Sequence, residues 1–325
     1  MTNSEAQTGI QRSNDLWFSD GDLIIQVANT SFRVYARILA ARSTVLADML
    51  AFPPPIDDVT NSNDTADGIP PVRLFDTDAD AELFFRAIFD SNFFMPPPSP
   101  TDLLLVLEVL RLSSKYDAQD LFRRALLHLE AVYPTSLLKF LAVPHKSHIN
   151  YADGALAGHF SALTAAMAFD ARWLLPAVYY EISCYPIREI LAAGEAWDSL
   201  AASQGHILST HSRRLDFLRA VNTFRFYTVV ESWCDDRDLC HHNSLYCAEK
   251  LVNFIARDDS MEPLRYWTDE TVDAYKYMRC DACREEVEED IERAQQEVWK
   301  GLPGAFGVAG LPELQKMKQA VMGSG

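Results

Sequence analysis

The sequence predicts an α+β protein with strands and helices in its first part and mostly helices in its second part. Two short runs rich in β-forming residues enclose a polar turn near the start of the chain, which is typical of a hairpin. Apolar residues then recur every three or four positions, which is typical of amphipathic helices. Beyond Pro134, strand signals become sparse while helical patterns continue. These three observations favour a small mixed domain followed by a helical one.

The elements of the first part follow from local patterns. Residues 22–27 and 32–35 are the two β-rich runs, and the polar stretch 29–31 between them predicts the turn. Apolar residues at three- and four-residue spacing predict a helix over 38–49. The prolines at 53–55 must end that helix, because proline removes a backbone donor and pushes the preceding residue out of the α region.

A further strand and three helices are predicted next. Residues 72–75 are short and apolar enough for a strand. Thr77 with Asp80 three positions later is a helix-start signature. Helical patterns then cover 103–112, which is apolar nearly all round, and 118–131. The first part of the chain is therefore a compact set of a hairpin, a helix, a strand and further helices.

The chain is predicted to divide into three regions. Residues 1–15 are polar and are expected to form a flexible tail. Residues 16–134 form the mixed domain, and residues 135–325 form a helical domain. The helical domain contains a cysteine-rich segment at 234–283.

Composition narrows the classes of partner. The chain has 325 residues, 48% of them hydrophobic, which is enough for two domains with packed cores. With 29 Lys and Arg against 46 Asp and Glu, the net charge is −17, which opposes binding to nucleic acid or to an anionic membrane. The N-terminus carries no apolar signal segment, and six cysteines are too few for a disulfide scaffold. We expect an intracellular protein, cytoplasmic, nuclear or both, with no nucleic-acid or membrane partner.

The first domain contains four short sequence motifs that can be compared with those of known domains. They are Phe32-Arg33-Val34, Leu39-Ala40-Ala41-Arg42-Ser43-Thr44-Val45, Val72-Arg73-Leu74-Phe75-Asp76 and Arg111-Leu112-Ser113-Ser114-Lys115-Tyr116-Asp117. In order and spacing, the domain resembles the BTB (POZ) domain, with its hairpin and helix, its next strand and its closing helices. The whole chain resembles the BTB proteins that mushroom-type fungi carry in many copies, which open with a phrase like 16–22 and close with one like 301–307.

The resemblance implies a non-enzymatic protein that binds other proteins. BTB domains self-associate, commonly as homodimers, and serve as scaffolds or adaptors. Many pair an aspartate at the Asp22 position with a basic residue at the dimer groove. The apolar segment Leu16, Trp17 and Phe18 is our candidate for the dimer face. It belongs to no predicted strand or helix, so its apolar side chains need another surface to pack on. The alternative is that this segment packs on its own domain.

A second functional class follows from the same resemblance. Some BTB proteins deliver substrates to cullin-type ubiquitin ligases, and these often carry a hydrophobic-x-Glu signal after the helix that precedes the proline-rich loop. Here Ile56-Asp57-Asp58 stands at that place. Ile56 and Asp58 are therefore the candidate residues for a cullin partner.

The cysteines suggest a metal site. The candidate ligands are Cys234, Cys240, Cys280 and Cys283, with His241 and His242 as alternatives. The C-x-x-C spacing of the last pair lets two thiolates reach one tetrahedral zinc ion, and a second pair could complete a structural four-thiolate site. Buried thiols without a metal are the other interpretation, because unpaired cysteine is among the most buried residue types.

Enzyme signatures are missing from the sequence. It contains no G-x-S-x-G, H-E-x-x-H, P-loop or G-x-G-x-x-G phrase. His145 and His148 lie in a loop without a neighbouring nucleophile and are expected on the surface. A zinc metalloenzyme is the remote alternative, and it would need an open coordination position and a nearby general base.

Overall fold

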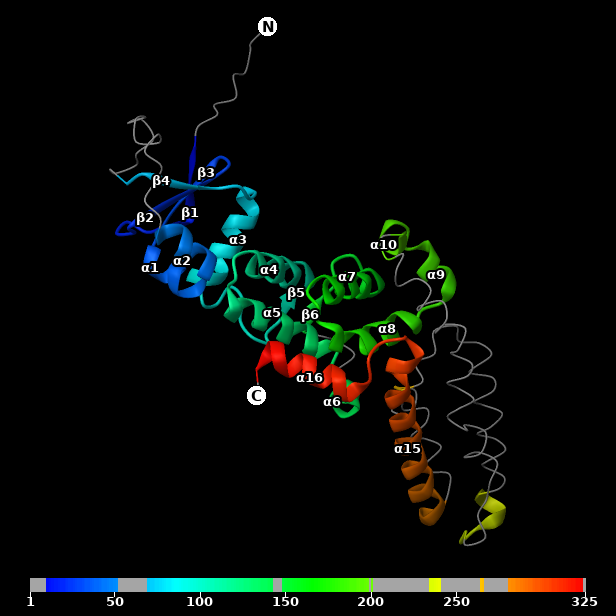
Figure 1. Cartoon of the computed structure of the whole chain (residues 1–325). Helices are drawn as coiled ribbons and strands as arrows, with labels where there is room; N and C mark the ends of the chain where they lie inside the picture. Colours follow the sequence, from blue (N-terminus) through cyan, green and yellow to red (C-terminus); the bar gives the residue numbers. More distant parts are fainter. Residues whose placement is uncertain are drawn as a thin grey trace. The chain divides into compact units, whose positions relative to one another are not determined.

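The computed structural model describes an α+β protein whose N-terminal region holds a mixed four-stranded sheet with helices and whose C-terminal region is mostly helical (Figure 1). This confirms the predicted fold class at that level. The described residues are 10–51, 69–142, 148–198, 200, 234–240, 264–265 and 280–323.

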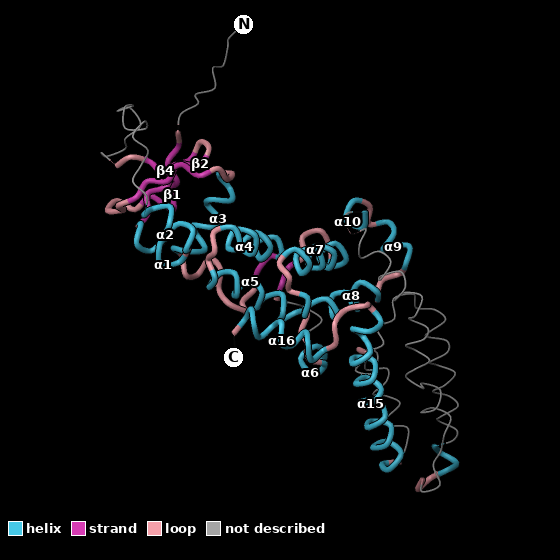
Figure 2. The backbone as a smooth tube through the Cα atoms, viewed as in Figure 1, coloured by secondary structure: helices cyan, strands magenta, loops and turns pink. Residues whose placement is uncertain are grey.

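The sheet is built around the predicted hairpin. Strands β2 (Leu23–Val27) and β3 (Thr30–Val34) pair antiparallel at its centre. The strands of the sheet are magenta in Figure 2. β1 (Gln11–Trp17) runs parallel to β3, and β4 (Pro71–Leu74) runs parallel to β2. The strand order is β1-β3-β2-β4, so β1 and β4 are the two edges of the sheet.

Two details of the sheet differ from the sequence prediction. The tail was expected to reach residue 15, but β1 begins at Gln11 because polar residues can form an edge strand when their backbone pairs with β3. The turn of the hairpin is also shorter than predicted. Val27 pairs with Thr30, which leaves only two residues in the loop, and the first of them, Ala28, has a φ of 44°.

The predicted helix over 38–49 is two helices, α1 (Ala36–Arg42) and α2 (Thr44–Ala51), separated by Ser43 in an extended conformation. The Ser43 hydroxyl accepts from the N–H of Leu46 at 3.0 Å and donates to the carbonyl of Tyr116 at 2.5 Å. A side chain that caps the next helix competes with continued helix, which explains the break.

The other helices of the N-terminal region begin close to where the sequence places them. They are α3 (Asp78–Phe89), α4 (Leu103–Lys115) and α5 (Gln119–Val132). Thr77 caps α3, and its hydroxyl accepts from the N–H of Asp80 at 3.1 Å. The helices and the sheet share a core of fully buried side chains, which includes Phe32, Phe84 and Phe85.

The described part of the C-terminal region contains several short helices and three longer ones. The described elements are α6 (Leu137–Ala142), α7 (Ala155–Ala168), the 3-10 turn η2 (Arg172–Leu174), α8 (Leu175–Ser183), α9 (Ile187–Ala192), α10 (Glu195–Asp198), α15 (Asp281–Ala305) and α16 (Leu311–Met322). The longer helices are α7, α15 and α16. Two short strands, β5 (Thr101–Asp102) and β6 (Ile149–Asn150), pair parallel.

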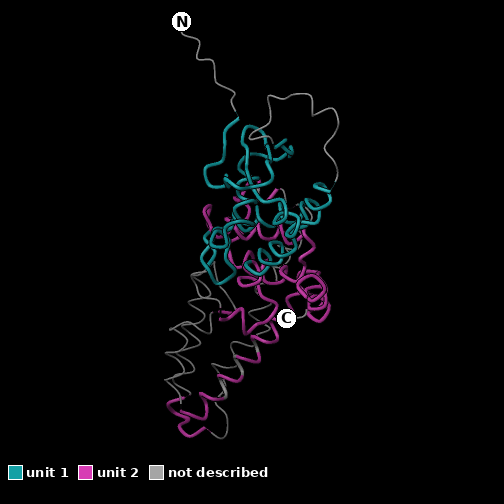
Figure 3. Tube along the Cα trace, turned by 90° about the vertical axis from the view of Figure 1, so that its left-hand side faces the viewer, with its two compact units in different colours: residues 1–128, 148–150 teal, residues 129–147, 151–325 magenta. Residues whose placement is uncertain are grey.

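The backbone divides into two compact units (Figure 3). The N-terminal unit holds residues 1–128 and 148–150, and the C-terminal unit holds 129–147 and 151–325. The boundary lies within α5, a few residues before the Pro134 at which the sequence suggested it. Strand β6 returns to the N-terminal unit because it pairs with β5.

Candidate metal centre

Four cysteines lie together in the C-terminal unit. The sulfur atoms of Cys234, Cys240, Cys280 and Cys283 all lie within 4.8 Å of one another. The Sγ atoms of Cys234 and Cys280 are 3.7 Å apart, although these residues are separated by 46 positions in the sequence. The structure therefore brings together the two pairs that the sequence offered as candidate ligands.

Two local structures hold these thiols. Cys280 is the N-cap residue of α15, and Cys283 follows in the first turn of that helix, which turns both side chains towards one side. On the other segment, the carbonyl of Asp236 accepts from the N–H of Cys240 at 3.0 Å. The two segments are joined by the N–H of Cys280, which points at the Cys240 sulfur at 3.3 Å.

The arrangement fits a zinc ion held by four thiolates. With Zn–S bonds of about 2.3 Å, tetrahedral geometry places the sulfur atoms about 3.8 Å apart. The Cys234–Cys280 distance of 3.7 Å matches this separation, and it is far too long for a disulfide, whose S–S bond is about 2.05 Å. The cluster could therefore hold a metal such as zinc, and four thiolates would fill its coordination shell.

The protonation states of the cluster are uneven. Burial opposes the charged form of Cys280, but the backbone N–H groups of Cys283 and Asp235 and the neighbouring thiols stabilise its thiolate and lower its pKa to about 6. Burial raises the pKa of Cys240 and of Cys283. A bound Zn²⁺ would deprotonate all four cysteines, because its charge stabilises the thiolate form.

Other residues proposed from the sequence lie elsewhere. His241 and His242, the alternative ligands, are outside the described residues, and so are Ile56 and Asp58, the candidate cullin contacts. Cys184 is buried at the C-terminal end of α8 and does not belong to the cluster.

The apolar segment proposed as a dimer face is largely packed within its own unit. Leu16 is only 2% exposed, so in a single chain it belongs to the core and not to a surface. Phe18 stacks on Tyr35, with ring centroids 5.1 Å apart, and Trp17 lies 4.4 Å from the guanidinium of Arg12. Trp17 and Phe18 remain partly exposed, and they are the part of the segment that a partner can reach.

Asp22 has a local role in the structure. Its carboxylate accepts from the N–H of Ala36 at 2.8 Å and so caps the first turn of α1. The neighbouring Arg37 is exposed. The hydrogen bond to the helix start gives Asp22 a function within one chain, whether or not it also lies at a dimer groove.

Sequence reasoning missed two buried histidine sites. His148 was expected on the surface, but it is partly buried, and its Nε2 lies 3.1 Å from Nδ1 of the fully buried His128. In the C-terminal unit, Nδ1 of His159 lies 2.7 Å from the hydroxyl of Tyr133. Burial lowers the pKa of His159 to about 4, so this ring is neutral. His128 and His159 each lie within a helical apolar pattern, and a histidine on such a face is the only signal the sequence offers.

The chain matches no family model, and no curated protein or solved structure matches it. Within the described residues, no helix combines the length and the apolar character needed to cross a lipid bilayer.

Proposed function

We propose that the protein is a non-enzymatic interaction protein that self-associates through a BTB-like N-terminal unit and presents its helical unit to a protein partner. The observation that carries this proposal is the order of elements in the N-terminal unit. A central hairpin, a pair of short helices, a strand parallel to the hairpin and then further helices follow one another along the chain. This order agrees with the resemblance that the phrases of 32–34, 39–45, 72–76 and 111–117 suggest.

Self-association would work through avidity. Joining two copies converts the second contact with a partner into an intramolecular one, so weak contacts gain in overall affinity. The edge strand β1 offers unpaired backbone groups on one side, and Trp17 and Phe18 at its end offer partly exposed apolar surface. These features support β1 and its neighbourhood as the contact surface between two copies.

The cysteine cluster supports a structural role for zinc. A catalytic zinc ion keeps a coordination position for water or substrate, whereas four cysteine sulfurs leave none. In this proposal zinc joins the start of α15 to the segment 234–240 and performs no chemistry. The metalloenzyme alternative loses its support from this site.

Sedimentation of the full chain tests the proposal. We expect a dimer that dissociates on dilution, and we expect Trp17→Ser to shift the equilibrium towards monomer. Leu138→Ser is the matched control, because Leu138 lies in the C-terminal unit and is 79% exposed. A chain that stays monomeric at the highest concentration reached would contradict the proposal.

The cullin adaptor remains a prediction from the sequence, because Ile56 and Asp58 lie outside the described residues. Calorimetry with the N-terminal domain of the cullin that serves BTB adaptors tests it. Binding that is lost on changing Ile56 and Asp58 together would make the adaptor the leading function.

A further inference from the structure

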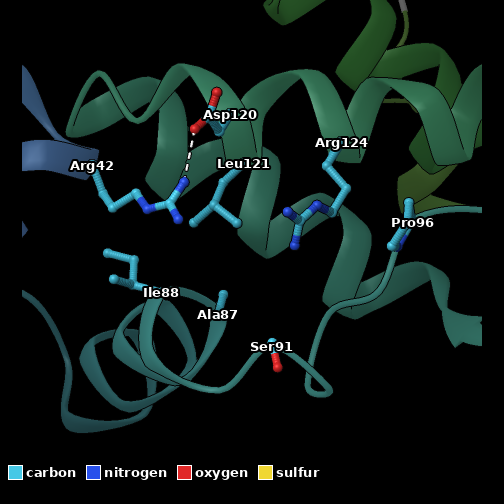
Figure 4. A pocket seen from close by; sticks show the side chains of 8 residues that line it. All are labelled: Arg42, Ala87, Ile88, Ser91, Pro96, Asp120, Leu121 and Arg124. Carbon is cyan, nitrogen blue, oxygen red and sulfur yellow. Dashed lines mark hydrogen bonds and ion pairs between the residues drawn. The ribbon is translucent and has the colours of Figure 1, made fainter. Parts of the chain in front are cut away.

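A pocket of about 160 Å³ lies in the N-terminal unit between α1, α3, the loop after α3 and α5 (Figure 4). Its apolar walls come from Ala87 and Ile88 on α3 and from Leu121 on α5. Ala87 and Leu121 are 5% and 6% exposed, so these walls belong to the packed core and keep their shape. An apolar cavity of about 150 Å³ admits a benzene molecule, so this space admits one aliphatic side chain.

Two guanidinium groups border this apolar space. Figure 4 shows Arg42 and Arg124 extending towards Leu121 from opposite sides. Nη1 of Arg42 lies 2.9 Å from Oδ2 of Asp120, so this pair is neutral overall. Nη1 of Arg124 donates to the carbonyl of Phe94 at 2.8 Å. Phe94 is 1% exposed, so its carbonyl holds the Arg124 guanidinium in place without neutralising it.

The pocket therefore carries one uncompensated positive charge. In the described part of the chain, no carboxylate lies within ion-pair distance of Arg124. The guanidinium fork matches the two oxygens of a carboxylate, and one carboxylate balances one positive charge. A phosphate monoester carries −1.5 to −2 charges, about twice what the pocket can balance. The positive charge of the pocket favours a ligand segment that carries a negative charge.

We infer that this pocket binds a segment of another protein in which an aliphatic residue is followed by an acidic one. The aliphatic side chain fills the space between Ile88 and Leu121, and the carboxylate pairs with Arg124. The Arg42 side chain is 53% exposed, so the pocket is open to solvent on that side. An extended segment can therefore pass across the pocket, and the bound residues need not lie at the end of a chain. This binding is separate from the self-association proposed above, and either can fail without the other.

Ligand-observed NMR with the full chain tests the inference. The probe is acetyl-Leu-Asp-amide, and its matched control is acetyl-Leu-Asn-amide, which has the same shape without the charge. We expect the aspartate peptide to bind roughly tenfold more tightly or better, because a hydrogen-bonded charge pair outweighs a neutral contact by that factor. Acetyl-leucine tests a terminal carboxylate, and we expect it to bind more weakly than the aspartate peptide.

Two variants locate the binding. Arg124→Gln keeps a donor for the Phe94 carbonyl and removes the charge, so we expect it to abolish the preference for aspartate over asparagine. Arg123→Gln removes the same charge from the adjacent exposed residue, which does not line the pocket, and we expect it to keep that preference. Equal binding of the two peptides to the unmodified protein, no binding at about 10 mM, tighter binding of acetyl-leucine, or equal losses in both variants would overturn the inference. The peptide comparison needs no variant and holds even if Arg124→Gln fails to fold.

Discussion

The two units of this chain hold together in different ways. The N-terminal unit has a sheet and helices that share a mostly apolar core, with aromatic contacts such as Phe32 against Phe85, whose ring centroids lie 5.1 Å apart. Both units contain polar links between distant segments, but the described cysteine cluster belongs to the C-terminal unit. The indole N–H of Trp299 donates to the carbonyl of Thr135 at 3.2 Å, and Arg265 pairs with Glu181 at 2.8 Å.

This difference determines which contacts can be predicted from local sequence patterns. In the N-terminal unit, the apolar residues of helices such as α3 and α4 recur every three or four positions, so local periodicity is a good guide to its elements. In the C-terminal unit, some of the residues that join distant segments are polar or sulfur-containing. The N–H of Leu264 donates to the Tyr180 hydroxyl, and its carbonyl accepts from the Gln295 amide, so a single residue links segments 84 and 31 positions away. The C-terminal unit should therefore respond to metal removal and, through the buried His159, to pH, whereas loss of the Phe85 side chain should act on the N-terminal unit.

Metal removal gives the largest expected effect. We expect the purified chain to carry one zinc ion. We expect Cys240→Ala to reduce the zinc content to near zero, because the three remaining thiolates cannot complete the four-coordinate shell of a structural zinc ion. Structural zinc binding in small domains supplies on the order of 10 kcal/mol at neutral pH, so the segments around 234–240 and the start of α15 should lose protection against hydrogen exchange.

Cys184→Ala is the control for this experiment, because Cys184 is buried outside the cluster. It should keep the full zinc content. If the wild-type chain binds no zinc when purified with the metal present, the structural-zinc prediction is wrong, and the four thiols are a metal-free packing cluster.

Removing apolar volume should affect the N-terminal unit alone. Phe85 is 1% exposed and packs edge-on against Phe32, so Phe85→Ala leaves a cavity and should cost about 3–5 kcal/mol of unfolding free energy. Hydrogen exchange read by mass spectrometry should show the loss in the strands and helices of residues 11–128, with zinc content unchanged. The control is Leu104→Ala, at a side chain that is 68% exposed, which should change stability by less than about 0.5 kcal/mol. Equal loss of protection in both units would show that Phe85 stabilises the whole chain and not the N-terminal unit alone.

A pH change should affect the C-terminal unit through His159. Its pKa falls from 6.5 to about 4 on folding, chiefly because burial disfavours the charged ring. The unfolded chain binds a proton below pH 6.5 and the folded chain does not, so the stability is present above pH 6.5 and is lost as the pH falls to about 4. The total loss over this window is about 3 kcal/mol, from a pKa difference between 6.5 and about 4.

His159→Asn provides the comparison for this effect. The asparagine amide can form a hydrogen bond with the Tyr133 hydroxyl as donor or as acceptor, but it does not titrate in this range. Urea unfolding at several pH values should give a flatter profile for the variant. His128 and His148, whose pKa values burial also lowers, should leave some pH dependence in the N-terminal unit. A variant with the same slope as the wild type in the C-terminal unit would contradict the assignment to His159.

The elements that could be predicted from the sequence are those that local patterns determine. The hairpin, α3, α4 and α5 follow from apolar periodicity and from cap signals, and the structure places them close to their predicted ranges. Strand β1 was missed because its residues are polar, and only pairing with β3 makes it a strand. The break at Ser43 was missed because it depends on the distant Tyr116 carbonyl.

The candidate sites show the same division. The C-x-x-C spacing identified one half of the cysteine cluster from local sequence, and the other half could only be offered as a candidate, because 39 intervening residues decide whether the pairs meet. The pocket between Arg42 and Arg124 was not predicted at all. Its walls come from three helices, and nothing in a linear pattern indicates that two arginines 82 positions apart face the same space.

The smallest expected effect is the loss of the Thr77 cap at the start of α3. The Thr77 hydroxyl accepts from the N–H of Asp80 and caps α3, as the sequence predicted, so Thr77→Ala should cost about 1 kcal/mol. Thr77→Asp should keep the cap and add a charge that the helix dipole favours, although Asp78 and Asp80 already occupy the first turn and would repel it. Urea midpoints should therefore rank the wild type at or above Thr77→Asp, and both above Thr77→Ala. If the alanine variant is as stable as the wild type, then α3 is held by the packing of Phe84 and Phe85, and its start signal describes the helix without stabilising it.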